Sequence, residues 1–96
     1  MLTQKELEKK LKELKPIVHQ KYFVDKLGYF GSYARNLQHK NSDVDVLVRL
    51  SKPLGWEFFD LKKELEIHLD SKVDLVTENA LKTQIKDRIL NSVKYV

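Results

Sequence analysis

The sequence predicts an α/β (α+β) fold in which helices cover a small mixed β-sheet. Two observations support this fold class. Apolar residues recur at steps of three or four in three long segments, as in amphipathic helices. Three short segments between them are rich in β-branched and aromatic residues, as in strands. The 96 residues contain no internal repeat and no linker, so a single domain over 1–96 is expected.

The first predicted element is an amphipathic helix near the start of the chain. Thr3–Glu6 has the pattern of a capping box, and leucines follow it at helical spacing. Pro16 lacks the backbone N–H that a helix interior needs, so it is expected to end or kink this helix. A second short helical piece, reaching Tyr22, is expected after the proline.

The rest of the chain is predicted to alternate strands and helices. Polar or glycine-containing segments bound each strand, and each longer helix shows one apolar stripe. The predicted elements are a strand over 24–30, a short helix over 32–37 capped by Ser32, a strand over 44–50, a helix over 58–69, a strand over 72–76 and a final helix capped by Asn79. Periodicity alone predicts neither the order nor the direction of the strands.

Composition excludes several classes of protein. No segment approaches the roughly 20 apolar residues of a membrane helix, and the first residues lack the apolar part of a signal peptide. A cytoplasmic location with no membrane partner is therefore expected. The absence of cysteine excludes disulfides and thiolate metal sites. Lysines that alternate with glutamates along the first helix explain much of the net charge of +4, so direct nucleic-acid binding is not expected.

Three aspartates are the candidate chemical groups. Asp43 and Asp45 stand two apart at the start of a strand, so their side chains point the same way. Asp74 lies within a later apolar strand, where an unpaired carboxylate costs several kcal/mol. If the two strands are neighbours, the three carboxylates face one site, and such oxygen ligands suit Mg²⁺ or Mn²⁺. Taken alone, Asp43 is equally well explained as a turn aspartate.

Gly31 and Ser32 form a candidate phosphate site. A glycine between a strand and a helix lets backbone amides approach a phosphate, and the serine hydroxyl adds a donor. Arg35 is a further candidate for phosphate binding, although a surface ion pair explains it equally well. A Gly-Ser pair by itself is a common helix cap, so the spacing to the aspartates is the informative part.

The combination of Gly31-Ser32, Asp43-Val-Asp45 and Asp74 closely resembles the nucleotidyltransferases of the DNA polymerase β superfamily. The stretches Gly-Ser-Tyr-Ala-Arg, Ser-Asp-Val-Asp and Lys-Val-Asp-Leu-Val resemble, within it, the minimal nucleotidyltransferases known as MntA antitoxins. The resemblance spans nearly the whole chain. It implies the polymerase-β-type fold, ATP bound with Ser32 at the triphosphate, and metal, as two Mg²⁺ or Mn²⁺ ions, held by the three aspartates. It also implies transfer of AMP from ATP to a tyrosine of a HEPN-domain toxin.

One residue departs from the family pattern, and two other functions stay open. Many family members have glycine at the position of Asn36, but asparagine tolerates a left-handed backbone, so the loop is expected to survive. The chain is alternatively a catalytically silent antitoxin or nucleotide-binding module that blocks its partner sterically. A third alternative is a nucleotidyltransferase that acts on RNA or a small molecule.

Three aromatic residues allow two interpretations. Tryptophan is a favoured anchor at protein interfaces, so the segment around Trp56 is a candidate contact with a partner. However, Trp56, Phe58 and Phe59 directly precede or begin a predicted helix that packs on the sheet. Burial in the core is therefore the expected role of all three.

Overall fold

The computed structural model describes residues 2–96 and confirms the α/β class. Its elements are α1 (Gln4–Tyr22), β1 (Val24–Phe30), α2 (Gly31–Ala34), β2 (Val44–Leu50), α3 (Glu57–Leu69), β3 (Val73–Thr77), the 3₁₀ turn η1 (Glu78–Ala80), α4 (Thr83–Ser92) and β4 (Lys94–Tyr95). The strands form one mixed sheet in the order β3-β2-β1-β4. β1 pairs with both β2 and β4 in antiparallel fashion, whereas β2 and β3 are parallel.

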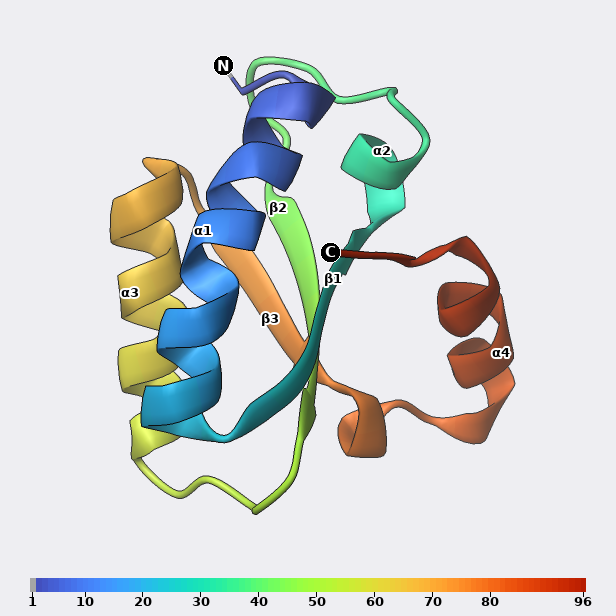
Figure 1. Cartoon of the computed structure of the whole chain (residues 1–96). Coiled ribbons are helices and arrows are strands. Elements are labelled where there is room, and N and C mark those ends of the chain that lie inside the picture. Colours follow the sequence, from blue (N-terminus) through green and yellow to red (C-terminus); the bar gives the residue numbers. More distant parts are fainter. Residues whose placement is uncertain (1) are drawn as a thin grey trace.

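The hydrophobic core lies between the sheet and the helices α1 and α3, which cover the same face (Figure 1). Alternate residues of β2, namely Val44, Val46 and Val48, point into this core and are fully buried. The leucines on the apolar stripes of the two helices complete it. They are Leu7, Leu11 and Leu14 of α1 and Leu61, Leu65 and Leu69 of α3. The intervening residues of β2 therefore point to the opposite face, on whose side α4 lies (Figure 1).

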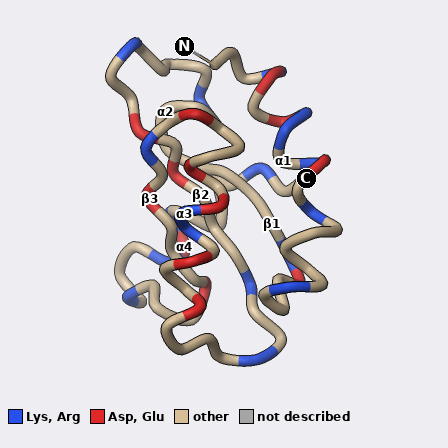
Figure 2. The backbone as a smooth tube through the Cα atoms, turned by 90° about the vertical axis from the view of Figure 1, so that its left-hand side faces the viewer, with Lys and Arg blue, Asp and Glu red and all other residues tan. Residues whose placement is uncertain are grey.

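The N-terminal helix confirms one prediction and corrects another. Thr3 and Glu6 form the predicted capping box, in which the Glu6 N–H donates to Thr3 Oγ1 at 3.1 Å. Pro16, however, neither ends the helix nor divides it, because α1 runs on to Tyr22. Pro16 is exposed, so the carbonyl that loses its helical donor there faces water. Basic and acidic residues are interspersed along α1 (Figure 2), as expected for a solvated face.

Three other predicted elements are shifted in the structure. The short helix occupies Gly31–Ala34 rather than 32–37, because Asn36 adopts a left-handed backbone with φ 55°. Phe30 is its N-cap, so Ser32 is not the cap. β3 begins at Val73 rather than Lys72. Asn79 does not cap the last helix, because it lies inside η1 and α4 begins only at Thr83.

The aromatic segment before α3 is the largest departure from expectation. Trp56 is 84% exposed and Phe59 is 61% exposed, and only Phe58 packs against the core. Phe58 stands three residues before Leu61 and so shares its buried stripe, whereas Phe59 is turned away from it. The prediction of core burial is therefore wrong for Trp56 and Phe59. Their rings contact each other at a centroid distance of 6.0 Å.

The exposure of Trp56 gives a direct optical test, since it is the one tryptophan in the sequence. Its fluorescence is expected to be red-shifted and quenched by acrylamide nearly as fast as that of a free tryptophan derivative. Trp56→Ala should change the free energy of unfolding by less than about 0.5 kcal/mol. Leu65→Ala is the matched control, because it empties a fully buried site and should cost about 2–5 kcal/mol. Blue-shifted, shielded emission would contradict the exposed position.

Candidate active site

The structure brings the three predicted aspartates to one end of the sheet. β2 and β3 are parallel neighbours, and their register places Asp45 directly beside Asp74. Adjacent strands lie about 4.8 Å apart, so the two side chains emerge next to each other on the face away from α1 and α3. Asp43 precedes β2 by one residue and lies at the same end. The sequence-based prediction that all three share one region is therefore confirmed for their placement on the sheet.

The electrostatics of Asp45 show how closely these carboxylates interact. Burial, and after it the neighbouring carboxylates of Asp74 and Asp43, together raise the pKa of Asp45 to about 6. No cation of the protein lowers it. Two ion pairs occur in residues 2–96, Lys21 with Glu64 and Arg49 with Asp25, and neither involves these aspartates. The site thus holds uncompensated negative charge.

Gly31 closes the site on the β1 side. It has a left-handed backbone with φ 70°, and a Cβ placed on it would overlap Oδ2 of Asp45 and lie 3.0 Å from its Cγ. The register of β1 and β2 explains this contact, because Phe30, just before the glycine, pairs with Asp45. Only a residue without a side chain therefore fits at the first position of α2 without displacing the carboxylate.

The other two predicted phosphate ligands lie close by in sequence and structure. Ser32 is in the first turn of α2, where backbone N–H groups have no partner within the helix. Its hydroxyl forms no hydrogen bond with the described part of the chain, and Arg35 forms no ion pair there. Arg35 is exposed at the end of α2. The role of Ser32 and Arg35 as phosphate ligands therefore stays a prediction.

The donor set suits a hard divalent cation. In residues 2–96 no three Asp, Glu or His side chains already stand in the arrangement of a metal site. The three aspartates nevertheless offer only oxygen ligands, which Mg²⁺ prefers. Their charges repel one another and no cation of the protein compensates them, so a bound Mg²⁺ would neutralise this charge. The residues therefore fit Mg²⁺ by ligand type. The three histidines are dispersed, and none lies beside these aspartates in the sheet register.

A polar hollow of about 560 Å³ adjoins Asp43. Its walls are the two segments that lead into β2 and β3, Lys40–Asp43 and Asp70–Lys72. Neither Lys40 nor Lys72 belongs to a motif that predicts a site. The available signal was their position, since one stands three residues before Asp43 and the other two residues before Asp74.

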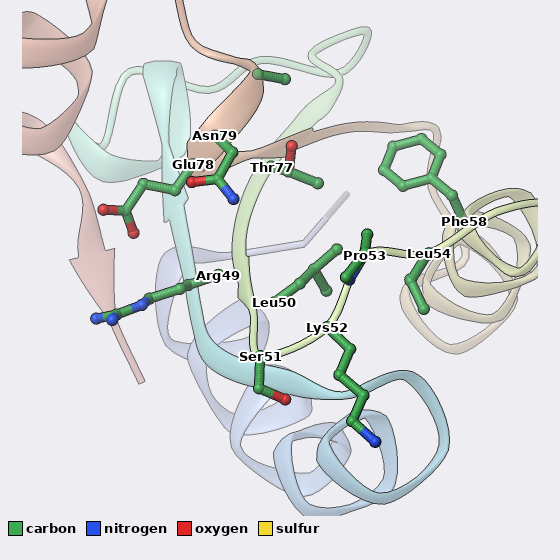
Figure 3. Close-up of a pocket in the computed structure, with 11 residues that line it drawn as sticks. Arg49, Leu50, Ser51, Lys52, Pro53, Leu54, Phe58, Thr77, Glu78 and Asn79 are labelled. Carbon is green, nitrogen blue, oxygen red and sulfur yellow. The ribbon is translucent and has the colours of Figure 1, made fainter.

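A second hollow, of about 570 Å³, lies at the opposite end of the same strands. Figure 3 shows the Arg49 guanidinium and the Glu78 carboxylate on one side of it and Phe58 and Leu54 on the other. It is lined by the ends of β2 and β3, whereas the aspartates stand at their beginnings. This hollow is therefore separate from the candidate active site.

Comparison with known proteins agrees with this arrangement. Residues 5–96 match the family described as nucleotidyltransferase domain. The chain belongs to the nucleotidyltransferase domain family. It is 38% identical over 97 residues to the protein adenylyltransferase MntA of Thermococcus cleftensis, with 100% of this chain and 98% of the relative covered.

Two solved structures share the fold of this nucleotidyltransferase. One, assigned as a minimal nucleotidyltransferase, superposes with a TM-score of 0.86 at 23% identity and covers 97% of this chain and 95% of that chain, which shows the shared fold. The other is a toxin–antitoxin complex with AMP-PNP, with a TM-score of 0.72 at 27% identity over 98% of this chain and 72% of that chain. The predicted polymerase-β-type fold is thus confirmed. None of the helices in residues 2–96 is both long and apolar enough to span a bilayer.

Proposed function

We propose that this nucleotidyltransferase transfers AMP from ATP to a tyrosine of a partner HEPN-domain toxin and thereby acts as its antitoxin. The observation that carries the proposal is the register of Asp45 beside Asp74, with Gly31 pressed against Asp45. A related adenylyltransferase that covers the whole chain supports AMP as the transferred group. The AMP-PNP complex of a similar toxin–antitoxin pair supports both ATP and the toxin partner.

The residues divide between the two sides of the reaction. Gly31 and Ser32, on the β1 side, would bind the triphosphate through backbone amides and the serine hydroxyl, with Arg35 at its edge. Asp43, Asp45 and Asp74 would hold two Mg²⁺ ions, for which Mn²⁺ is a substitute. When bound, these ions neutralise phosphate charge and favour an in-line displacement.

The transfer itself exchanges one phosphorus–oxygen bond for another. The tyrosine oxygen forms a bond to the α-phosphorus, the bond from that phosphorus to the bridging oxygen breaks, and pyrophosphate leaves. Asp74 lies on the β3 side of Asp45, away from Gly31. We assign this carboxylate to the acceptor side of the reaction, where one of its oxygens would bind metal and the other would accept the proton of the incoming hydroxyl.

The proposal is tested by incubating the protein with α-labelled ATP, Mg²⁺ and the HEPN toxin. Label is expected on a toxin tyrosine, and it should be absent with EDTA and in Asp43→Ala. Asp87→Ala, an exposed aspartate on α4, is the matched control and should transfer label normally. Parallel reactions with α-labelled GTP measure the preference for adenine.

A purely steric antitoxin predicts a different result. In that case Asp43→Ala would still neutralise the toxin as well as the unchanged protein does, and no label would reach the toxin. Label on added RNA or on a small molecule, with none on the toxin, would instead favour the third alternative.

A further inference from the structure

The polar hollow next to Asp43 lies on the side of the site that the phosphate-binding residues leave open. Gly31 contacts Asp45 from the β1 side. The sheet order β3-β2-β1 places the hollow on the other side, because its walls lead into β2 and β3. The two walls are joined by a hydrogen bond in which the Val44 N–H donates to the Lys72 carbonyl at 2.9 Å. Asp45 therefore stands next to Gly31, and Asp43 borders the hollow.

This placement matters for the direction of attack. In an in-line displacement the attacking oxygen approaches opposite the leaving group. If the triphosphate lies over Gly31 and Ser32, the acceptor hydroxyl must arrive from the β3 side, where the hollow is. No aromatic or large apolar residue lines the hollow. The hollow therefore suits a polar part of the acceptor better than an aromatic ring.

The charges of the hollow favour an anion. Lys40 and Lys72 are exposed and line it from opposite walls, and neither forms an ion pair within residues 2–96. Of the two acidic residues in its walls, Asp43 is assigned to metal binding by the proposed function. The charges of the two lysines and two aspartates cancel without metal, and with a metal bound to Asp43 only Asp70 opposes the two lysines, so the hollow is then net positive.

Both walls are held in place by local hydrogen bonds. Ser42 Oγ accepts from the His39 N–H at 2.9 Å, and the Ser42 N–H donates to the His39 carbonyl at 2.9 Å. On the other wall, the Ser71 N–H donates to the Glu66 carbonyl at 3.3 Å. The backbone that carries each lysine is thus fixed relative to the aspartates.

We propose that Lys40 and Lys72 hold an anionic group of the acceptor while its hydroxyl is modified. This inference rests on the proposed function and names the chemistry of its acceptor. Two sources supply such an anion. One is a carboxylate near the target tyrosine, and the other is the phosphodiester of an AMP attached in an earlier transfer, as in the tri-AMPylated HEPN toxin solved with its antitoxin. Both present negative oxygens that two ammonium groups recognise.

The test compares Lys40→Gln/Lys72→Gln with the unchanged protein in the presence of toxin, ATP and Mg²⁺. The matched control is Lys9→Gln/Lys63→Gln, which removes the same charge from exposed positions on α1 and α3. Intact-mass measurements follow the successive additions of AMP to the toxin, and titration with AMP-PNP gives the nucleotide Kd. Thermal unfolding verifies that both variants are folded.

We expect the KM for the toxin to rise about tenfold in Lys40→Gln/Lys72→Gln, with the Kd for AMP-PNP within about twofold of the unchanged protein. A slower first addition would identify a carboxylate as the anion, and slowing confined to later additions would identify the phosphodiester. Unchanged transfer, or an equal loss of AMP-PNP affinity, would overturn the acceptor role. If the unchanged protein transfers no AMP, the proposed function itself fails and the acceptor role falls with it.

Discussion

Asp45→Asn is expected to abolish AMP transfer while making the metal-free protein more stable. The substitution keeps the size of the side chain but removes a charge that the site needs for metal and substrate. Stabilisation of transition-state charge by bound metal is worth several kcal/mol, so transfer should fall by about 10³-fold or more. The rate of label transfer from α-labelled ATP measures this loss.

The gain in stability follows from the like charges around Asp45. Its pKa is raised from 3.8 to about 6, chiefly by burial and then by Asp74 and Asp43, so the folded state binds the proton more tightly than the unfolded state. The contribution of this proton to stability is complete below about pH 4 and is lost as the pH rises through 6. Because Asn at position 45 carries no charge, the carboxylates of Asp43 and Asp74 no longer repel it. At pH 7.5 the substitution should therefore raise the free energy of unfolding by about 1–2 kcal/mol after allowance for solvent screening.

Chemical denaturation of the metal-free proteins between pH 4 and 7.5 tests this sign. The stability difference between Asp45→Asn and the unchanged protein should be largest at pH 7.5 and shrink towards zero near pH 4. Asp87→Asn, at an exposed position of α4, should show no such gain. An Asp45→Asn variant that is less stable than the unchanged protein at pH 7.5 would refute the like-charge account.

Gly31→Ala is expected to reduce transfer at least 100-fold and to lower stability. Its φ of 70° costs about 1–2 kcal/mol for a residue with a Cβ, and that Cβ would overlap Oδ2 of Asp45. Either the carboxylate or the strand end must move. A displacement near 1 Å in a reacting site can cost about 10²-fold in rate. Transfer kinetics and thermal unfolding measure the two effects.

Gly55→Ala is the matched control for this substitution. Gly55 lies before α3, far from the aspartates in the sheet, and an added Cβ there meets only Glu57 Oε2 at an ordinary 3.4 Å. It should retain transfer within about twofold. Full activity in Gly31→Ala as well would show that the close approach of Asp45 to Gly31 has no role in the reaction.

Two of the strands could be predicted with their bounds because local patterns determine them. β1 and β2 have the predicted bounds, since apolar runs closed by glycine or polar loops leave little freedom in where a strand begins. Asp45 and Asp74 each interrupt an apolar strand, but the structure leaves Asp74 exposed and Asp45 half-buried, so the expected cost of a buried carboxylate was wrong for Asp74. The left-handed backbone of Asn36 was likewise expected from its residue type.

The features that could not be predicted depend on contacts between distant segments. The sheet order and the pairing of the two-residue strand β4 with β1 depend on tertiary contacts, and no local sequence pattern indicates them. Pro16 stays within α1 because the rest of that helix packs on the core, and packing outweighs one missing hydrogen bond. Trp56 is exposed because the rotation of α3 about its axis, set by Leu61 and Leu65, turns the residue outward.

The register of β2 and β3 links the assembly of the site to folding. Side chains alternate along a strand, so a slip of β3 by one residue would turn Asp74 into the apolar core and expose Val73 and Leu75 to solvent. Such a misaligned chain would lose both its packing and its reactive centre in one step. A folded protein without the paired aspartates is therefore strongly disfavoured. The same folding equilibrium that stabilises the core also keeps the fraction of molecules with a misaligned site low.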